Sequence, residues 1–305
     1  MLRFALRRLL VALLVALAVS AASFLLVFLA GDPAVAMLGQ GGRAEDAAAL
    51  RTLYGFDRPL PIQYAAWLAK ALVGDFGRSQ FFNLPVAAIL WERLPTTMTL
   101  GVCGLAFALA LSLPLGILAA LRPNSALDRI ALLVAVTGQA IPSFWLGLML
   151  IVLLGVVFPV LPISGADDWR GFVLPTVVLG YYATPGFMRL TRAGMIDVLE
   201  ADFIRTARAK GLSAPDVVLR HALPNAIIPV VSLAAVQFGF MLSGSIVIES
   251  VFALNGVGRL AWESITRSDL PVVQAIVLVF AVIYVILTLA ADLLNAWLDP
   301  RIRAA

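Results

Sequence analysis

The sequence has very few cysteine and histidine residues, which often act as nucleophiles, bases or metal ligands. One cysteine, Cys103, and one histidine, His221, occur among its 305 residues. A single cysteine cannot form an internal disulfide, and a zinc site needs about four Cys or His ligands. Catalysis with a histidine base would have to use His221. The sequence therefore predicts no catalytic centre, no metal site and no cofactor.

Lysine is also scarce, and Lys70 and Lys210 are the two in the chain. Ala71 and Gly211 follow them, so the phosphate-binding pattern G-x-x-x-x-G-K-[ST] is absent. The chain does not bind ATP through a P-loop of its own. Any ATP-driven process would need a separate ATPase subunit.

Charged residues make up only 13% of the chain, whereas 62% is hydrophobic and the mean hydropathy is +0.99. Typical soluble domains are close to half apolar and a quarter charged. These values exclude a soluble globular domain, a disordered chain and a coiled coil. The net charge of +4 fits membrane topology better than nucleic-acid binding, because the basic residues flank apolar stretches. We expect a single all-helical membrane domain.

A membrane-spanning helix needs about 20 mostly apolar residues. Six stretches meet this requirement and predict six spans, at residues 9–30, 97–121, 130–158, 173–188, 226–248 and 272–291. The first stretch is longer than the apolar region of a signal peptide, so it predicts a retained span.

The distribution of Lys and Arg predicts that both termini are cytoplasmic. In that orientation the inner side carries Arg3, Arg7, Arg8, Arg122, Arg129, Arg189, Arg192, Arg205, Arg208, Lys210, Arg220, Arg301 and Arg303. The short outer loops hold only Arg170, Arg259 and Arg267, and long loops weigh little in this rule. Residues 31–95 then form a periplasmic cap, with helical pieces at 44–54 and 63–73.

Residues 189–225 form a long, charged cytoplasmic loop in this orientation. Residues 191–210 contain few helix breakers and end at Gly211, which suits a helix C-cap. We expect one helix here, closed by a left-handed glycine turn.

A second helix start follows directly. Ser213 and Asp216 have the spacing of a capping box, and Pro215 lies in the first turn. The pattern predicts a short helix over residues 214–222 that stops before Pro224. Such a capped helix suits docking into a groove of another protein, and an ordinary amphipathic surface helix fits equally well.

The same loop resembles a motif of bacterial ABC-importer permeases, E-A-A-x-x-x-G-x(9)-I-x-L-P. The spacing matches from Ala207 to Gly211 and on to Leu223 and Pro224, with Arg205 and His221 in place of the motif's Glu and Ile. Further similar segments are Gly31-Asp32-Pro33, Gly55-Phe56-Asp57-Arg58-Pro59-Leu60, Gly74-Asp75-Phe76-Gly77, Glu249-Ser250-Val251-Phe252, Gly256-Val257-Gly258-Arg259-Leu260 and Leu298-Asp299-Pro300-Arg301-Ile302-Arg303. Over nearly its whole length the chain resembles the first permease subunit of the dipeptide/oligopeptide/nickel class.

This resemblance implies a type I importer permease fold and a role as one half of a membrane pathway. It also implies a second permease subunit, two cytoplasmic ABC ATPases and a periplasmic solute-binding protein as partners, besides membrane lipid. A heterodimer is expected, and a homodimer stays open. The ATPase-coupling residues that the resemblance implies are Arg205, Thr206, Ala207, Gly211, Ser213, Asp216, His221, Leu223 and Pro224. Peptides, glutathione, nickel chelates, opines and sugars all stay open as substrates.

Polar residues inside the predicted spans are candidates for lining a pathway, because polar groups in spans usually face the protein interior. They are Gln139, Pro142, Ser143, Gln237, Ser243 and Ser245, and Pro142 should also kink its span. Hydrogen bonding between neighbouring helices is the alternative role for these residues.

Two acids leave a second function open. Asp292 near the inner end of the last span, or Glu249 near the outer end of the fifth, could relay protons in an ion- or proton-driven secondary transporter. We favour anchoring or ion pairing for both. An intramembrane hydrolase is a poor fit, since His221 lies in a cytoplasmic loop and Cys103 in the second span.

Overall fold

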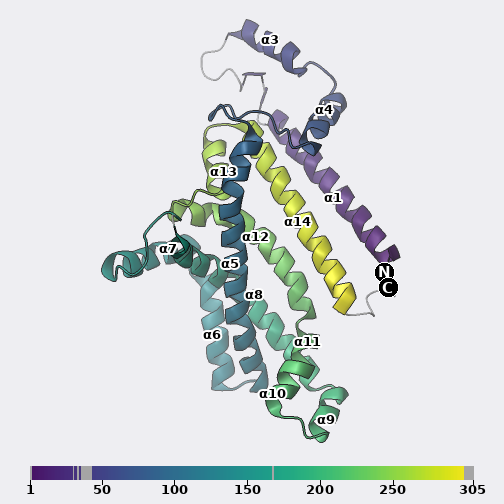
Figure 1. Cartoon of the computed structure of the whole chain (residues 1–305), viewed down its shortest axis with the longest axis vertical. Helices are drawn as coiled ribbons and strands as arrows, with labels where there is room; N and C mark the ends of the chain where they lie inside the picture. The colour runs from purple at the N-terminus through teal and green to yellow at the C-terminus, as the bar shows by residue number, and fades with distance from the viewer. Residues whose placement is uncertain (1, 30, 33, 36–42, 167, 299–305) are drawn as a thin grey trace.

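The computed structural model describes residues 2–29, 31–32, 34–35, 43–166 and 168–298 (Figure 1). These residues form helices and connecting loops, with one isolated bridge between Arg78 and Pro85. The α-helices are α1 (Leu2–Leu29), α3 (Ala44–Tyr54), α4 (Leu60–Leu72), α5 (Val86–Leu121), α6 (Ala126–Ala140), α7 (Ser143–Ile151), α8 (Val173–Leu199), α9 (Asp202–Ala209), α10 (Ala214–Asp216), α11 (Leu223–Ala226), α12 (Ile228–Val251), α13 (Val257–Thr266) and α14 (Leu270–Leu298). Two π-helical segments, η1 (Val152–Val157) and η3 (Val217–Ala222), and the 3-10 helix η2 (Trp169–Phe172) complete the set. The all-helical prediction is confirmed.

Four helices in the described part of the chain are long and apolar enough to cross a membrane. They lie at Ala5–Leu25, Val86–Leu121, Ile228–Val251 and Leu270–Trp297, and a fifth span results if the bent pair α6 and α7–η1 is counted as one. The fourth predicted span, residues 173–188, lies in α8, which is not among these helices. Its apolar stretch is short, because the charged residues Arg189, Arg192 and Asp197 follow directly after it. By length and composition the described residues give four or five spans, and the predicted count of six is not confirmed.

The third predicted span is broken. Residues 130–158 do not form one continuous helix, because α6 and α7–η1 meet at 97°. Ile141, which precedes Pro142, has an extended backbone with φ −92° and ψ 125°, as the proline ring requires. The predicted kink at Pro142 is confirmed, and it is sharper than a kink within one helix.

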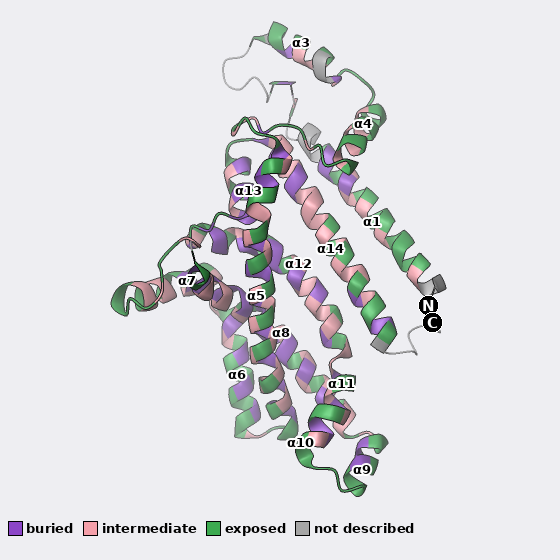
Figure 2. Ribbon diagram, viewed as in Figure 1, coloured by how far each residue is buried: buried purple, intermediate pink, exposed green. Residues whose placement is uncertain are grey.

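The largest apolar core lies where α5, α8 and α12 pack together. It includes Leu100 of α5, Phe187 of α8 and Ile248 of α12, each at most 1% exposed. Helices α5 and α8 approach closely at Gly180, where a Cβ atom would lie 2.4 Å from the carbonyl oxygen of Gly104. Figure 2 shows buried residues concentrated on these helices, whereas α1 is largely exposed.

Helix α1 packs beside α14 and is fixed to it near both ends. Ser23 Oγ donates to the carbonyl oxygen of Gln274 at 3.2 Å, and Gln274 Nε2 donates back to that of Ser23 at 3.3 Å. At the other end, Arg8 and Asp292 form an ion pair of 3.1 Å. Because apolar side chains cover its remaining surface, α1 suits contact with lipid.

Residues 31–95 contain the predicted helices. Helix α3 coincides with the predicted 44–54, and α4 begins three residues before the predicted 63. Arg51 of α3 pairs with Asp32 and donates from Nε at 2.8 Å, and this hydrogen bond holds the pKa of the Asp32 carboxyl below its usual value. Both helices lie at the end of the molecule opposite α9–α11 (Figure 1).

Some residues of the predicted elements lie outside the described residues. They are residues 30, 33 and 36–42 of the predicted first span and cap, and residues 299–303 of the C-terminal motif.

Candidate functional site

Helices α9, α10, η3 and α11 form a knob, residues 202–226, at one end of the molecule (Figure 1). The prediction of a single helix over residues 191–210 is wrong. Residues 191–199 are the end of α8, and a break at Ala201 separates them from α9. Ala201 has an extended backbone with φ −69° and ψ 150°, which starts a new helix. The knob is therefore set off from the long helix that leads into it.

The turn at Gly211 and the cap at Ser213 have the predicted geometry. Gly211 has φ +77°, a conformation that side chains other than glycine rarely adopt. Ser213 Oγ accepts from the backbone N–H of Asp216 at 3.3 Å and contacts its carboxylate at 2.5 Å. Together they reverse the chain within a few residues and begin α10.

The predicted end of the second helix before Pro224 is wrong. The chain passes from α10 through the π-helical η3 into α11, with Pro224 in the first turn of α11. Proline is tolerated there because the N–H groups of a first turn have no partner within their own helix. The helical path thus continues from the knob towards α12.

The knob has its own apolar interior. Ile204 and Ala207 of α9 pack with Val217, Ala222 and Met195. Ala207 is therefore 5% exposed and lies inside the knob. This packing holds α9 and η3 together as one unit against the end of α8.

The surface of the knob carries three large apolar side chains that the sequence analysis missed. Phe203, Leu212 and Leu219 are 46%, 40% and 55% exposed. The strong segregation of apolar and charged residues in α9 was the signal that could have located Phe203. Exposed apolar groups on a charged loop are typical of a surface that contacts another protein.

The remaining coupling candidates lie in the same helices of the knob. Arg205 pairs with Asp202 at 3.2 Å, and Arg220 pairs with Asp216 at 3.4 Å. Thr206 Oγ1 donates to the carbonyl oxygen of Asp202 at 3.0 Å. The candidates His221, which is half-buried, Leu223, which packs against the knob interior, and Pro224, which is exposed, lie in η3 and α11. All nine predicted coupling residues thus belong to the knob.

A second polar cluster joins α6 to α8. Arg192 donates to Asp128 through Nε at 2.8 Å and through Nη2 at 2.7 Å. The backbone N–H of Asn124 donates to the same carboxylate at 2.9 Å, and Ser125 Oγ caps α6 by accepting from the Asp128 N–H at 3.3 Å. Because α8 leads into the knob, this cluster fixes the position of α6 relative to it.

The six pathway-lining candidates do not gather at one place. Gln139 and Pro142 are exposed and Ser143 is half-buried at the α6–α7 break. Ser243 Oγ donates to the carbonyl oxygen of Phe240 at 3.0 Å, and the buried Ser245 donates to that of Leu242 at 2.7 Å.

Gln237 lies against α8. Its Nε2 atom is 3.5 Å from the position that a Cβ atom of Gly186 would take. Gln237 therefore borders the surface of α8.

Glu249 is fully buried between α5, α12 and the start of α13. Its Oε1 accepts from Thr97 Oγ1 at 2.7 Å, and its Oε2 accepts from the backbone N–H of Arg259 at 2.8 Å. The backbone N–H of Val257 donates to Thr97 Oγ1 at 2.8 Å. Two of the motif segments thus meet at one carboxylate.

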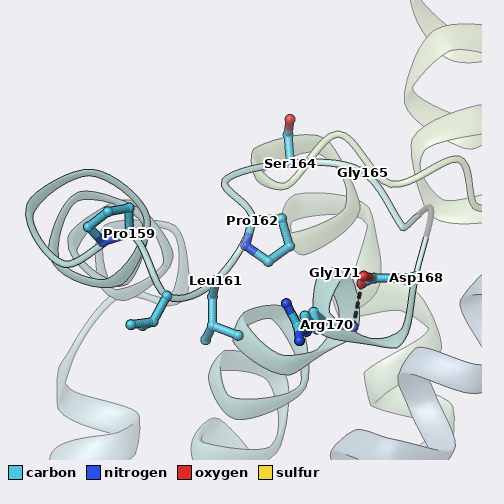
Figure 3. Close-up of a pocket in the computed structure, with 9 residues that line it drawn as sticks. Pro159, Leu161, Pro162, Ser164, Gly165, Asp168, Arg170 and Gly171 are labelled. Carbon is cyan, nitrogen blue, oxygen red and sulfur yellow. Dashed lines mark hydrogen bonds between the residues drawn. The ribbon is translucent and has the colours of Figure 1, made fainter.

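A shallow pocket of about 410 Å³ lies in the loop between η1 and η2 (Figure 3). Asp168 Oδ1 accepts from the backbone N–H of Arg170 at 2.8 Å beside it. The pocket is lined by none of the predicted site residues. In the described part of the chain no group of three or more His, Cys, Asp or Glu residues is placed to hold a metal ion.

Comparisons with known proteins decide the family. The profile described as "Binding-protein-dependent transport system inner membrane component" matches residues 112–304, and the N-terminal profile of the same kind of protein matches residues 1–101. The chain belongs to this family. The permease is thus a membrane subunit of a binding-protein-dependent ABC importer, and the subunit itself is not catalytic.

Curated relatives cover the whole length of this permease. It is 40% identical over 304 residues, 99% of each chain, to the "Glutathione transport system permease protein GsiC" of Escherichia coli (strain K12) and of Salmonella typhimurium (strain LT2). The family works with ATPase, solute-binding and permease partners and lies in the bacterial inner membrane.

A solved structure shares the fold. A chain of the MetNI methionine ABC transporter in an inward-facing conformation superposes with a TM-score of 0.57 at 19% identity, covering 69% of this permease and 96% of that chain. At this identity the match supports the ABC importer permease fold alone.

Proposed function

We propose that this permease forms one half of the membrane pathway of an ATP-driven importer for glutathione or similar small peptides. The substrate class is suggested by the relatives named as glutathione transport permeases, which are 40% identical over the full length. The partner permease is a different chain of the same family, and a periplasmic solute-binding protein delivers the substrate.

The knob of residues 202–226 is the site on which a cytoplasmic ATPase docks. The observation that carries this proposal is the compact capped knob with exposed Phe203, Leu212 and Leu219 at its surface. Two ATPases serve the permease pair, one on each knob. When ATP closes the ATPase pair, each knob moves as a unit, and the spans alternate between inward and outward access.

Docking of an ATPase on the knob implies the orientation. The knob, both chain termini and the Arg8–Asp292 pair lie on the cytoplasmic side, and the cap of residues 31–95 lies on the periplasmic side. The positive charges near the inner ends of the spans fit this arrangement. The whole chain is then one transmembrane permease domain.

The test is purification of the tagged permease from its host in a mild detergent, with mass spectrometry of the proteins recovered in stoichiometric amounts. We expect a second permease and P-loop ATPases. Leu219→Asp places a charge on the docking surface without disturbing the knob interior, so it should lose the ATPases and keep the second permease. Ala207 is a less informative site, because it is buried in the knob.

Leu72→Asp is the matched control, since Leu72 is 79% exposed in α4, far from the knob. This variant should keep both partners. Recovery of stoichiometric ATPases with Leu219→Asp would contradict docking on the knob.

A further inference from the structure

One face of α8 is open and carries an arginine in the C-terminal half of the helix. Tyr182, Arg189, Ala193 and Asp197 are the exposed residues of α8, all of which is described. Their spacings of seven, four and four residues place them on one side of the helix. Helix α8 packs on α5, α6, α7, α11 and α12 with its other sides, so this face is the part of the central helix that is left free.

Arg189 forms no ion pair and no side-chain hydrogen bond with any described residue. Arg192, one turn further on, is held by two hydrogen bonds to Asp128. The Tyr182 hydroxyl and the Gln237 amide likewise have no hydrogen-bond partner among the described residues. The sequence analysis counted Arg189 only as a basic residue near the inner side, because the face on which it lies depends on tertiary packing.

The three unpartnered groups border α8 within two helical turns of one another along its axis. Tyr182, Gly186 and Arg189 follow each other on successive turns of α8. Gln237 of α12 reaches α8 at Gly186, and its Nε2 atom lies 3.5 Å from the position that a Cβ atom of Gly186 would take. A cation, an amide and a phenol thus border one stretch of open surface.

Arg189 lies directly after the predicted fourth span, on the part of α8 that leads to the cytoplasmic knob. An unpaired guanidinium at such a position is costly against lipid and is favoured where it meets water or an oppositely charged group. The open face of α8 is therefore suited to contact with water or a bound solute at the inner part of a pathway. A guanidinium presents paired N–H donors that match the two oxygens of a carboxylate, and neighbouring amide and hydroxyl groups add further hydrogen bonds.

We propose that Arg189 is a substrate-contacting residue of the pathway and binds the carboxylate of a small peptide in transit, with Gln237 and Tyr182 beside it. This inference rests on the proposed function, because it assigns a residue to the passage of a peptide-like anion. One guanidinium holds the carboxylate, and the site is open to water. Binding is therefore weak enough for the substrate to be released, as transport requires.

The experiment uses the complete importer in proteoliposomes with ATP inside and the binding protein outside. Uptake of a transported peptide with a free C-terminal carboxylate is compared with uptake of its C-terminal amide. The ratio of the two rates in each variant is divided by the ratio in the wild type, which cancels the preference of the binding protein. Arg189→Gln should lower the acid-to-amide ratio about tenfold, the size of one charge-assisted contact.

Arg189→Lys, which keeps the charge and loses the paired donors, should have a smaller effect on the ratio. Arg122→Gln removes an exposed arginine outside this face of α8 and should leave the ratio unchanged. An unchanged ratio in Arg189→Gln, or an equal loss of acid and amide uptake, would overturn the role of Arg189. No ATP-dependent peptide uptake by the wild type would instead overturn the proposed function.

Discussion

The carboxylate of Glu249 lies 2.7 Å from Thr97 Oγ1 and accepts its hydrogen bond within the protein interior. The same carboxylate accepts the backbone N–H of Arg259 at the start of α13. Helix α5, which is distant in the sequence, thus meets α12 and the start of α13 at one acid. This arrangement makes Glu249 an anchor for the α12–α13 turn, the role that we favoured over a proton relay.

Glu249→Ala should destabilise the permease strongly. The change leaves the Thr97 hydroxyl and the Arg259 N–H without acceptors in a buried site, which costs about 2–4 kcal/mol. Chemical unfolding of the purified chain in detergent micelles measures this loss. Glu92→Ala, at an exposed position of α5, should change the stability by less than about 0.5 kcal/mol. Equal effects of the two substitutions would contradict the anchoring role.

Gly138 allows α6 to pack directly against α8. A Cβ atom at Gly138 would lie 2.3 Å from the carbonyl oxygen of Tyr181, so Gly138→Ala should force the helices apart and cost about 1–3 kcal/mol. Gly244 is also helical but has no atom within 4 Å of a Cβ position. Gly244→Ala should therefore be neutral or stabilising by up to about 1 kcal/mol. The same unfolding assay compares them, and a Gly138→Ala protein as stable as the wild type would refute the close packing.

The Asp128–Arg192 pair should contribute to stability as a unit. Removing Arg192 leaves a nearly buried carboxylate with only a backbone donor, and partial exposure of the arginine limits the cost of Arg192→Ala to about 1–3 kcal/mol. A double-mutant cycle with Asp128→Ala should give a coupling energy of about 1 kcal/mol or more. Arg122→Ala is the control, because Arg122 is exposed and forms no ion pair with a described residue. A coupling energy near zero would show that the pair is only a surface contact.

Gly211 should be required for the shape of the knob. Its φ of +77° lies in the left-handed region, where a side chain adds about 1–2 kcal/mol of strain. Gly211→Val should weaken recovery of the ATPases without loss of the second permease. Gly244→Val is the control for replacing a glycine by valine, because a Cβ atom at Gly244 of α12 would have no atom within 4 Å. Full ATPase recovery with Gly211→Val would show that docking does not depend on this turn.

Local signals predicted the features of this permease that depend on a few neighbouring residues. Gly211 and Ser213 define a turn and a cap through backbone preferences that hold in any context. The break at Pro142 was expected for the same reason, but its 97° angle was not, because it depends on how α7 packs against α8 and α12. The continuation through Pro224 was missed because η3 and α11 change the helical register before the proline.

Features that depend on tertiary packing were not predictable from patterns. Glu249 and Arg259 were recognised as parts of similar motifs, yet nothing local indicated that they touch. Ala207 was interpreted as a partner-contact position, whereas its burial follows from packing on Val217 and Met195. Arg189 was assigned to the inner side by charge counting, and its open face on α8 became visible only in the folded chain.

The most direct test of the account is uptake of labelled glutathione by the reconstituted importer under two energy sources. With ATP inside the vesicles and no ion gradient, we expect uptake that requires the ATPases and persists in Asp292→Asn, because Asp292 is the ion-pair partner of Arg8 near the membrane surface and has no part in driving transport. Uptake driven by a proton gradient without ATP, and abolished by Asp292→Asn, would contradict the account and establish a secondary transporter.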